Sequence, residues 1–259
     1  MVIGFESWIF LIAGIVTGVI TGMVGASAIV AFVPLILLFL DYDVFSLIGV
    51  SLAVDVFVSL TALLMYKKFH HINFKTGIYL SIFAVVGAII GSYVSIFLPN
   101  DSLLGITGLV SALTGVGIFL RKENSEKHNR FNQKLSLRKP LSFVPILLAF
   151  IIGFAAGSLG AAGGISLLLL FVFLFRFELH KAIGTSIFVM FFIALAGSVT
   201  HFYYIKFSWE LLIFAVVGGV TGAIFSSRIA NYLKEKTLNR IVGIILFVLG
   251  ISIFLQRIL

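Results

Sequence analysis

The chain has 259 residues, of which 61% are hydrophobic and only 11% are charged. Average soluble domains are about a quarter charged, so this composition excludes that class and leaves no room for a soluble catalytic domain. The net charge of +8 does not indicate a nucleic-acid partner, because the basic residues lie in short segments between apolar runs instead of on one solvated face.

Eight apolar runs, each nearly free of charge, follow one another along the chain. A membrane-spanning helix needs about 20 apolar residues, so runs of this kind predict helices that cross a lipid bilayer. We therefore expect an all-α integral membrane protein that is multi-pass and lies in the cell (cytoplasmic) membrane. The runs are 7–40, 44–66, 76–98, 102–120, 142–175, 182–205, 211–227 and 241–256.

The chain contains two related halves, because glycines recur in both at a constant separation of 135 residues. Chance placement would give about one or two such pairs, and hydrophobicity alone does not fix glycine positions. We predict a first transmembrane repeat over 1–120, a basic cytoplasmic linker over 121–140 and a second repeat over 141–259. The pairs are Gly18/Gly153, Gly22/Gly157, Gly25/Gly160, Gly49/Gly184, Gly87/Gly222, Gly108/Gly243 and Gly115/Gly250.

The first run of each half is too long for one crossing. Its 34 residues would form a helix of about 51 Å, against a hydrocarbon core of about 30 Å. Each run either crosses once as a tilted helix or breaks at its glycines into a helical hairpin or half-helices. If each run returns to its starting side, every Lys and Arg except Lys206 and Arg257 lies on one side, as the positive-inside rule favours.

Equivalent loops of the two halves would then face opposite sides, which makes the halves inverted-topology repeats of four runs each. That architecture is typical of secondary transporters with a binding site at the membrane midplane. Segments interrupted by glycine at corresponding positions are the best pointer to such a site. A half-helix that begins near Ser27 or Gly164 would direct free N–H groups and a positive dipole end toward an anion.

The predicted substrate-binding residues lie in these interruptions and in a polar pair that the repeat also matches. Close helix packing through small residues is the alternative for the glycines, and it explains Gly18 and Gly153 better. For the hydroxyl groups the alternative is a bond back to the residue's own helix. The candidates are Gly25, Ala26, Ser27, Ser51, Gly160, Ala161, Gly163, Gly164, Thr185 and Ser186.

Asp55 is the one acidic or basic residue deep inside an apolar run. A charge at membrane depth costs about 2.5–3.5 kcal/mol on insertion scales, so we interpret Asp55 as a proton-coupling residue; a structural hydrogen bond is the alternative. Its repeat partner is Met190, so the acid is not symmetric. We interpret His201, beside Tyr203 and Tyr204, as part of an interfacial aromatic belt.

No pattern predicts a metal site, a cofactor or catalysis, since the chain has no cysteine and its apolar runs hold one acid. A polytopic protein of this kind is expected to be a transporter and not an enzyme.

The chain also resembles a known family over nearly its whole length. The motif GxxxGxxGAS begins at Gly18, GxxxGxxGAAGG begins at Gly153, and the halves share IGxS and IGTS, which end at Ser51 and Ser186. With the closing stretch GAIFSSRIANYLKEKTLNRIVGIILFVLGISIF, these are similar to the TauE/SafE sulfite-exporter-type family of anion transporters. The resemblance implies secondary transport of small sulfur-containing anions, such as sulfite, sulfonates or sulfoacetate-like compounds, with protons as the coupling partner. A drug/metabolite-type exporter is the alternative that an inverted repeat leaves open.

Overall fold

Helices make up all the regular structure of the described part of the chain. The computed structural model describes residues 4–97, 143–160, 163–205 and 207–234, together with Thr237 and Ile244. Five of its helices are long and apolar enough to cross a membrane, which confirms the all-α prediction. The predicted runs 102–120 and 241–256 and the linker 121–140 lie outside the described residues, apart from Ile244.

The first half begins with two helices where the sequence has one apolar run. Helix α1 (Phe5–Val24) ends at Gly25, whose φ of 69° places it in the left-handed region that favours glycine. After four residues outside the helices, 25–28, the chain resumes as α2 (Ile29–Leu37), followed by α3 (Val44–Lys68) and α4 (Phe74–Ser95). The predicted interruption of the long first run is therefore confirmed.

The second half repeats this pattern. Helix α7 (Phe143–Leu159) ends at Gly160, with a φ of 64°, exactly one repeat length after Gly25. Helix α8 (Gly163–Leu169) then continues into the π-helical turn η1 (Leu170–Leu174). The half goes on with α9 (Leu179–Phe202) and α10 (Trp209–Tyr232).

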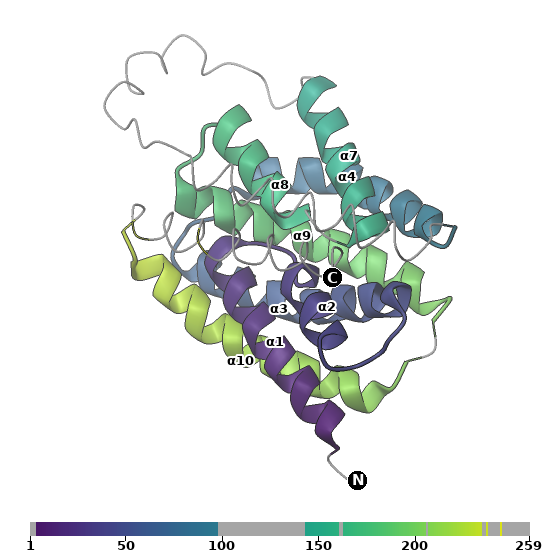
Figure 1. Cartoon of the computed structure of the whole chain (residues 1–259). Coiled ribbons are helices and arrows are strands. Elements are labelled where there is room, and N and C mark those ends of the chain that lie inside the picture. Colours follow the sequence, from purple (N-terminus) through teal and green to yellow (C-terminus); the bar gives the residue numbers. More distant parts are fainter. Residues whose placement is uncertain are drawn as a thin grey trace.

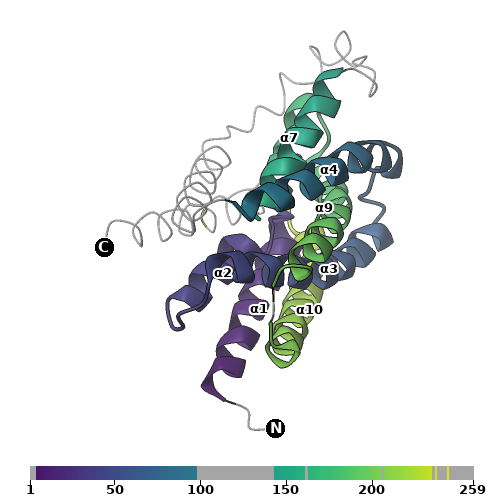
Figure 2. The same cartoon turned by 90° about the vertical axis from the view of Figure 1, so that its right-hand side faces the viewer.

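The halves interlock instead of packing as separate bundles. Helix α1 lies along α10 from the other half, α4 lies along α7, and α3 packs against α9 between these two pairs (Figures 1 and 2). Both outer pairs run parallel, since successive glycines of one helix meet successively later residues of its partner.

Glycines allow these outer pairs to approach backbone to backbone. A Cβ atom on Gly18 would collide with the carbonyl oxygen of Gly219, and one on Gly153 would collide with that of Ala84. Gly219 and Ala84 are themselves one repeat length apart, so the same close contact occurs in both pairs. The packing explanation for Gly18 and Gly153 is thus confirmed.

The described part of the molecule has one acidic end and one basic end. At the acidic end the start of α1 meets the loop that follows α2, where the Tyr42 hydroxyl donates to Glu6 Oε2 at 3.1 Å. Phe207, just before α10, packs on Tyr42 with ring centroids 6.2 Å apart. Burial and the neighbouring Glu6 carboxylate raise the pKa of the Tyr42 phenol. The first apolar run therefore begins and ends at the same end of the molecule.

The basic end lies where α3, α4, α9 and α10 meet. His71, in the loop between α3 and α4, has its Nδ1 2.6 Å from Asn231 Oδ1 and its ring 5.1 Å from that of His180. The acidic, basic and histidine residues within these loops and helix ends are Lys67, Lys68, His70, His71, Lys75, Arg176, Glu178, His180, Lys181, Arg228 and Lys234. Helix α7 starts at this end too, because it runs parallel to α4.

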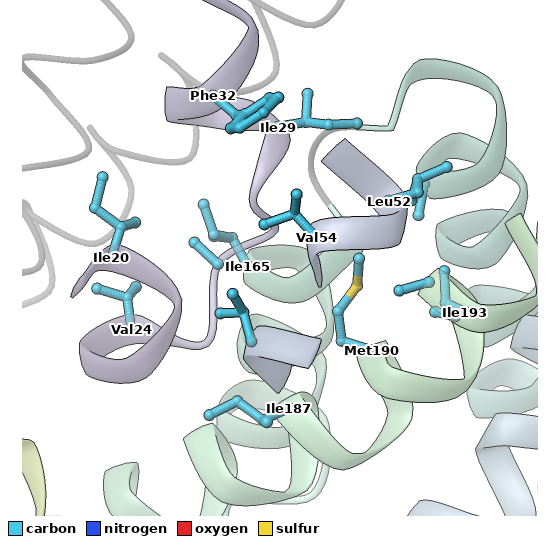
Figure 3. Close-up of a cluster of buried hydrophobic side chains, with 14 of the residues drawn as sticks. Ile20, Val24, Ile29, Phe32, Leu52, Val54, Ile165, Ile187, Met190 and Ile193 are labelled. Carbon is cyan, nitrogen blue, oxygen red and sulfur yellow. The ribbon is translucent and has the colours of Figure 1, made fainter. Parts of the chain in front are cut away.

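A continuous apolar core fills the space around the two interruptions. Figure 3 shows Ile20 and Val24 of α1, Ile29 and Phe32 of α2, Ile165 of α8 and Met190 of α9 as members of one cluster of buried hydrophobic side chains. Met190 is 1% exposed and Ile29 is 1% exposed, so water is excluded from the surroundings of both breaks. A polar group among these side chains must find its partner within the protein.

Candidate functional site at the meeting of the two interrupted helices

Asp55 lies near the middle of α3 and is completely buried. Its Oδ2 atom is 2.8 Å from the Ser27 hydroxyl and accepts a hydrogen bond from the Ala28 N–H at 3.1 Å. Ser27 and Ala28 form the interruption between α1 and α2. The buried carboxyl is therefore held by the break of its own half, at the start of α2 where N–H groups are free.

The Ser27 hydroxyl also reaches the other half. It lies 2.9 Å from the carbonyl oxygen of Gly160, the residue that ends α7. The Ser27 hydroxyl, which has a single hydrogen, therefore lies between the Asp55 carboxyl and the interruption of the second half. Asp55 Oδ1 has no hydrogen-bond partner among the described residues, although it is fully buried.

Gly25 and Gly164, which belong to the two interruptions, pack against each other beside Ser27. A Cβ atom on Gly164 would collide with the Gly25 carbonyl oxygen and would lie 3.0 Å from the Ser27 nitrogen. A Cβ atom on Gly25 would meet the Ser186 hydroxyl at 2.7 Å. The structure therefore brings together five of the residues that the sequence analysis singled out, which are Gly25, Ser27, Gly160, Gly164 and Asp55. Ala26 is buried within the same break, whereas Ala161 lies outside the described residues.

The same geometry recurs in the second half without the acid. Met190, the repeat partner of Asp55, would have its sulfur 3.1 Å from a Cβ atom on Gly163. Gly163 is the repeat partner of Ala28, whose N–H binds Asp55. Each half thus places a residue of its second long helix against the start of its short helix. Only the first half uses a carboxyl there, which gives the site one acidic side.

The hydroxyl groups predicted to complete an anion shell bond to their own helices. Ser51 donates to the Ile48 carbonyl and Ser186 to the Ile183 carbonyl, both at 2.8 Å. The Thr185 hydroxyl donates to the Lys181 carbonyl at 2.6 Å and accepts from the Asn73 N–H at 3.0 Å. The alternative of bonding back to the helix therefore describes all three hydroxyls in this conformation.

The interpretation of His201 as part of an interfacial aromatic belt is wrong. Its side chain is fully buried, whereas Tyr203 and Tyr204 are 84% and 48% exposed, so His201 does not belong to an interfacial belt. Its Nε2 atom lies 3.2 Å from the Gly157 carbonyl oxygen in the last turn of α7. The sequence carried a signal for this contact, because His201 is the repeat partner of Tyr66 and Gly157 is the repeat partner of Gly22.

Within the described residues, no three His, Asp or Glu side chains lie close enough together to hold a metal ion. The site is instead made of backbone groups, one hydroxyl and one carboxyl, enclosed by apolar helices. Such an arrangement can bind a small polar solute or a proton at membrane depth, where irregular backbone is tolerated only if protein or water satisfies it.

Apolar helices of membrane-spanning length, two interrupted runs and a buried carboxyl between them are the features of a multi-pass membrane protein with a polar site inside it. The family model described as sulfite exporter TauE/SafE matches residues 10–253. The chain belongs to this family, as its motifs indicated. No solved structure matches the chain.

Curated relatives are similar over much of their length. A Bacillus subtilis protein named probable membrane transporter protein YunE is 26% identical over 268 residues, which cover 96% of this chain and 98% of that protein. Another from the same organism, probable membrane transporter protein YdhB, is 24% identical over 86% of this chain and 89% of its own. A probable membrane transporter protein of Xylella fastidiosa is 24% identical over 71% of this chain and 69% of its own.

Proposed function

We propose that this protein is a secondary active transporter of small sulfur-containing anions, such as sulfite, sulfonates or sulfoacetate-like compounds, in the cell membrane. It works by alternating access and is coupled to protons through Asp55. The observation that carries this proposal is the Ser27 hydroxyl, which contacts both the interrupted helix of the second half and the buried Asp55 carboxyl of the first. The family of sulfite exporters supports the substrate class.

The arrangement of the helices supports an inverted-topology repeat. Helix α1 starts at the acidic end of the molecule, whereas its equivalent α7 starts at the basic end. The repeat also relates the two outer pairs of helices. Helix α1 of the first half packs on α10 of the second, just as α7, the equivalent of α1, packs on α4, the equivalent of α10. With the basic end in the cytoplasm, this arrangement follows the positive-inside rule. Two halves that oppose each other around a central site suit alternating access.

The hydrogen count at Ser27 supports proton binding by Asp55. An ionised carboxylate only accepts hydrogen bonds, so the single Ser27 hydrogen would have to serve both Asp55 and the Gly160 carbonyl. A protonated carboxyl instead donates to the Ser27 oxygen, which leaves the Ser27 hydrogen for Gly160. The Ala28 N–H can donate to the carboxyl in either form. The contact between the halves is therefore fully hydrogen-bonded when Asp55 carries a proton.

Electrostatic repulsion would couple the binding of a proton by Asp55 to the binding of an anionic substrate. The Asp55 carboxyl accepts a hydrogen bond from the Ala28 N–H at the start of α2. The N-terminus of a helix is also where a bound anion would be expected, so the anion would lie close to Asp55. Two negative charges 4 Å apart repel by about 4 kcal/mol at an effective dielectric constant of 20. A proton on Asp55 removes this repulsion, so the anion and the proton bind together. Transport of the anion would then carry a proton with it.

The test is transport of labelled sulfite and sulfoacetate by the purified protein in liposomes, with and without a pH gradient. We expect flux that follows the gradient. In Asp55→Asn the amide still donates to Ser27 but takes up no proton, so flux should no longer respond to the gradient. Asp41→Asn, which removes an exposed acid, is the matched control and should behave like the unmodified chain.

Two outcomes would contradict the proposal. A pH gradient that still drives flux in Asp55→Asn would refute proton coupling at this residue. Transport of uncharged organic solutes, with no flux of any sulfur-containing anion, would favour the drug/metabolite-type exporter instead.

A further inference from the structure

Two fully buried side chains, Tyr66 and His201, contact carbonyl groups near the ends of α1 and α7, and neither belongs to the site described above. The Gly157 carbonyl near the end of α7 also accepts a hydrogen bond from the Ser92 hydroxyl of α4 at 3.1 Å. The Tyr66 hydroxyl donates to the Gly22 carbonyl oxygen at 3.2 Å, and His201 Nε2 lies 3.2 Å from the Gly157 carbonyl oxygen. A carbonyl oxygen only accepts, so the hydrogen of the neutral His201 ring is on Nε2. Each glycine lies three residues before the left-handed glycine that ends its helix.

These two contacts are equivalent in the repeat. Tyr66 and His201 are 135 residues apart, as are Gly22 and Gly157, and each donor is 44 residues from its acceptor. The last four carbonyl groups of a helix have no partner within that helix. Both halves therefore use the same position to bind a carbonyl in the last turn before the break, although one uses a phenol and the other an imidazole.

The two donor side chains approach the breaks from opposite ends of the molecule. Tyr66 is next to the basic end, with its ring centroid 6.5 Å from that of His71. The His201 ring packs on Phe45, in the first turn of α3 at the acidic end, with a centroid distance of 4.6 Å. Phe45 and Tyr66 are 21 residues apart on α3, which corresponds to about 31 Å. Asp55 lies midway between them.

We propose that Tyr66 and His201 are positioning residues for transport, one clamping the end of α1 from the basic end and the other clamping the end of α7 from the acidic end. This inference rests on the alternating access proposed above. Release of one clamp frees the interrupted helix at that end and opens the site to that side, while the other clamp stays closed. The two bonds are broken in turn and not together.

The test uses the absence of cysteine from the chain. Ser27→Cys places a single thiol at the centre of the site, and a membrane-impermeant maleimide added to one side of oriented liposomes reports access from that side. Tyr66→Phe is then combined with Ser27→Cys to remove only the hydroxyl at the basic end. His201→Asn removes the donor at the acidic end, because the shorter amide does not reach the Nε2 position.

We expect opposite shifts in the two variants. Tyr66→Phe should speed labelling from the side of the basic end and slow it from the other side, and His201→Asn should do the reverse. A hydrogen bond of ordinary net strength corresponds to a change of roughly two- to tenfold in each rate. His201→Gln keeps an amide N–H near the Nε2 position and should restore both rates to within about twofold. Tyr203→Phe removes the hydroxyl of an exposed ring and is the control.

Three results would overturn the inference. Shifts in the same direction in both variants would show that the two bonds only tighten the fold. Equal behaviour of His201→Gln and His201→Asn would show that the Nε2 donor is not the group that matters. Failure of Tyr66→Phe and His201→Asn to give monodisperse protein, when His201→Gln does, would make the bonds a requirement for folding alone.

Labelling needs no transported anion, so it separates this inference from the proposed substrate. Opposite shifts without sulfite flux would support the clamps and refute the substrate class. Sulfite flux with shifts in the same direction would refute the clamps and leave the substrate class standing.

Discussion

Ser27→Ala is the substitution that tests the contact between the halves most directly. It removes one oxygen atom and with it the contacts to Asp55 at 2.8 Å and to Gly160 at 2.9 Å. Asp55 keeps the Ala28 N–H at 3.1 Å. The Gly160 carbonyl loses the donor from the first half, and the change in volume is too small to add a substantial cavity.

The expected cost follows from these contacts. A buried polar group left without its partner costs about 1–3 kcal/mol, and we expect a loss of that size in the free energy of unfolding. Reversible unfolding in mixed detergent micelles measures it. The control is Ser81→Ala, which removes another buried hydroxyl that bonds only to the Gly77 carbonyl of its own helix at 2.7 Å. The control should lose less than about 1 kcal/mol, because helix carbonyls keep their backbone partners.

Equal losses in the two variants would refute the reasoning. They would mean that the Ser27 hydroxyl contributes no more than a local bond and that the contact between the interrupted helices does not stabilise the fold. A loss in Ser27→Ala that disappears in the Asp55→Asn background would show that the carboxyl, and not Gly160, is the partner that matters.

Three further predictions concern packing, backbone conformation and ionisation. Gly153→Val should lower the free energy of unfolding by about 1–3 kcal/mol or more, since its side chain would collide with the Ala84 carbonyl; thermal unfolding in detergent measures this. Gly25→Ala should cost about 1–2 kcal/mol in the same assay, because φ is 69° there. Tyr42 should ionise at higher pH than a free phenol, and Glu6→Gln should lower its pKa in an ultraviolet titration read against Tyr42→Phe. An unchanged titration in Glu6→Gln would show that burial alone sets this pKa.

The sequence predicts the interruptions well because their cause is local. A residue with positive φ is strongly favoured to be glycine, and the repeat marks Gly25 and Gly160 as equivalent. Length adds the second constraint, since 34 apolar residues exceed one crossing. The acid at position 55 also stands out locally, because an uncompensated charge at membrane depth is costly.

The meeting of Ser27 with Asp55 and Gly160 does not follow from local sequence. It depends on the angle at which α2 leaves α1 and on the crossing of the halves, so it joins residues 28 and 133 positions apart. The burial of His201 could not be predicted for a different reason. The chain leaves α9 after Phe202, so the exposure of the two tyrosines that follow says nothing about the face on which His201 lies.

The crosswise pairing of the outer helices has a consequence for how the protein is made. Among the described helices, α1 has its glycine-matched partner in α10, near residue 219, so the ribosome makes the first helix long before this neighbour exists. Until α10 is made, the small-residue face of α1 has to be covered by other groups. The same delay is much shorter for α4 and α7, because Ser95 and Phe143, which end α4 and begin α7, are 48 positions apart. The order of synthesis therefore allows the α4–α7 pair to close before the α1–α10 pair, which needs the last of the described long helices.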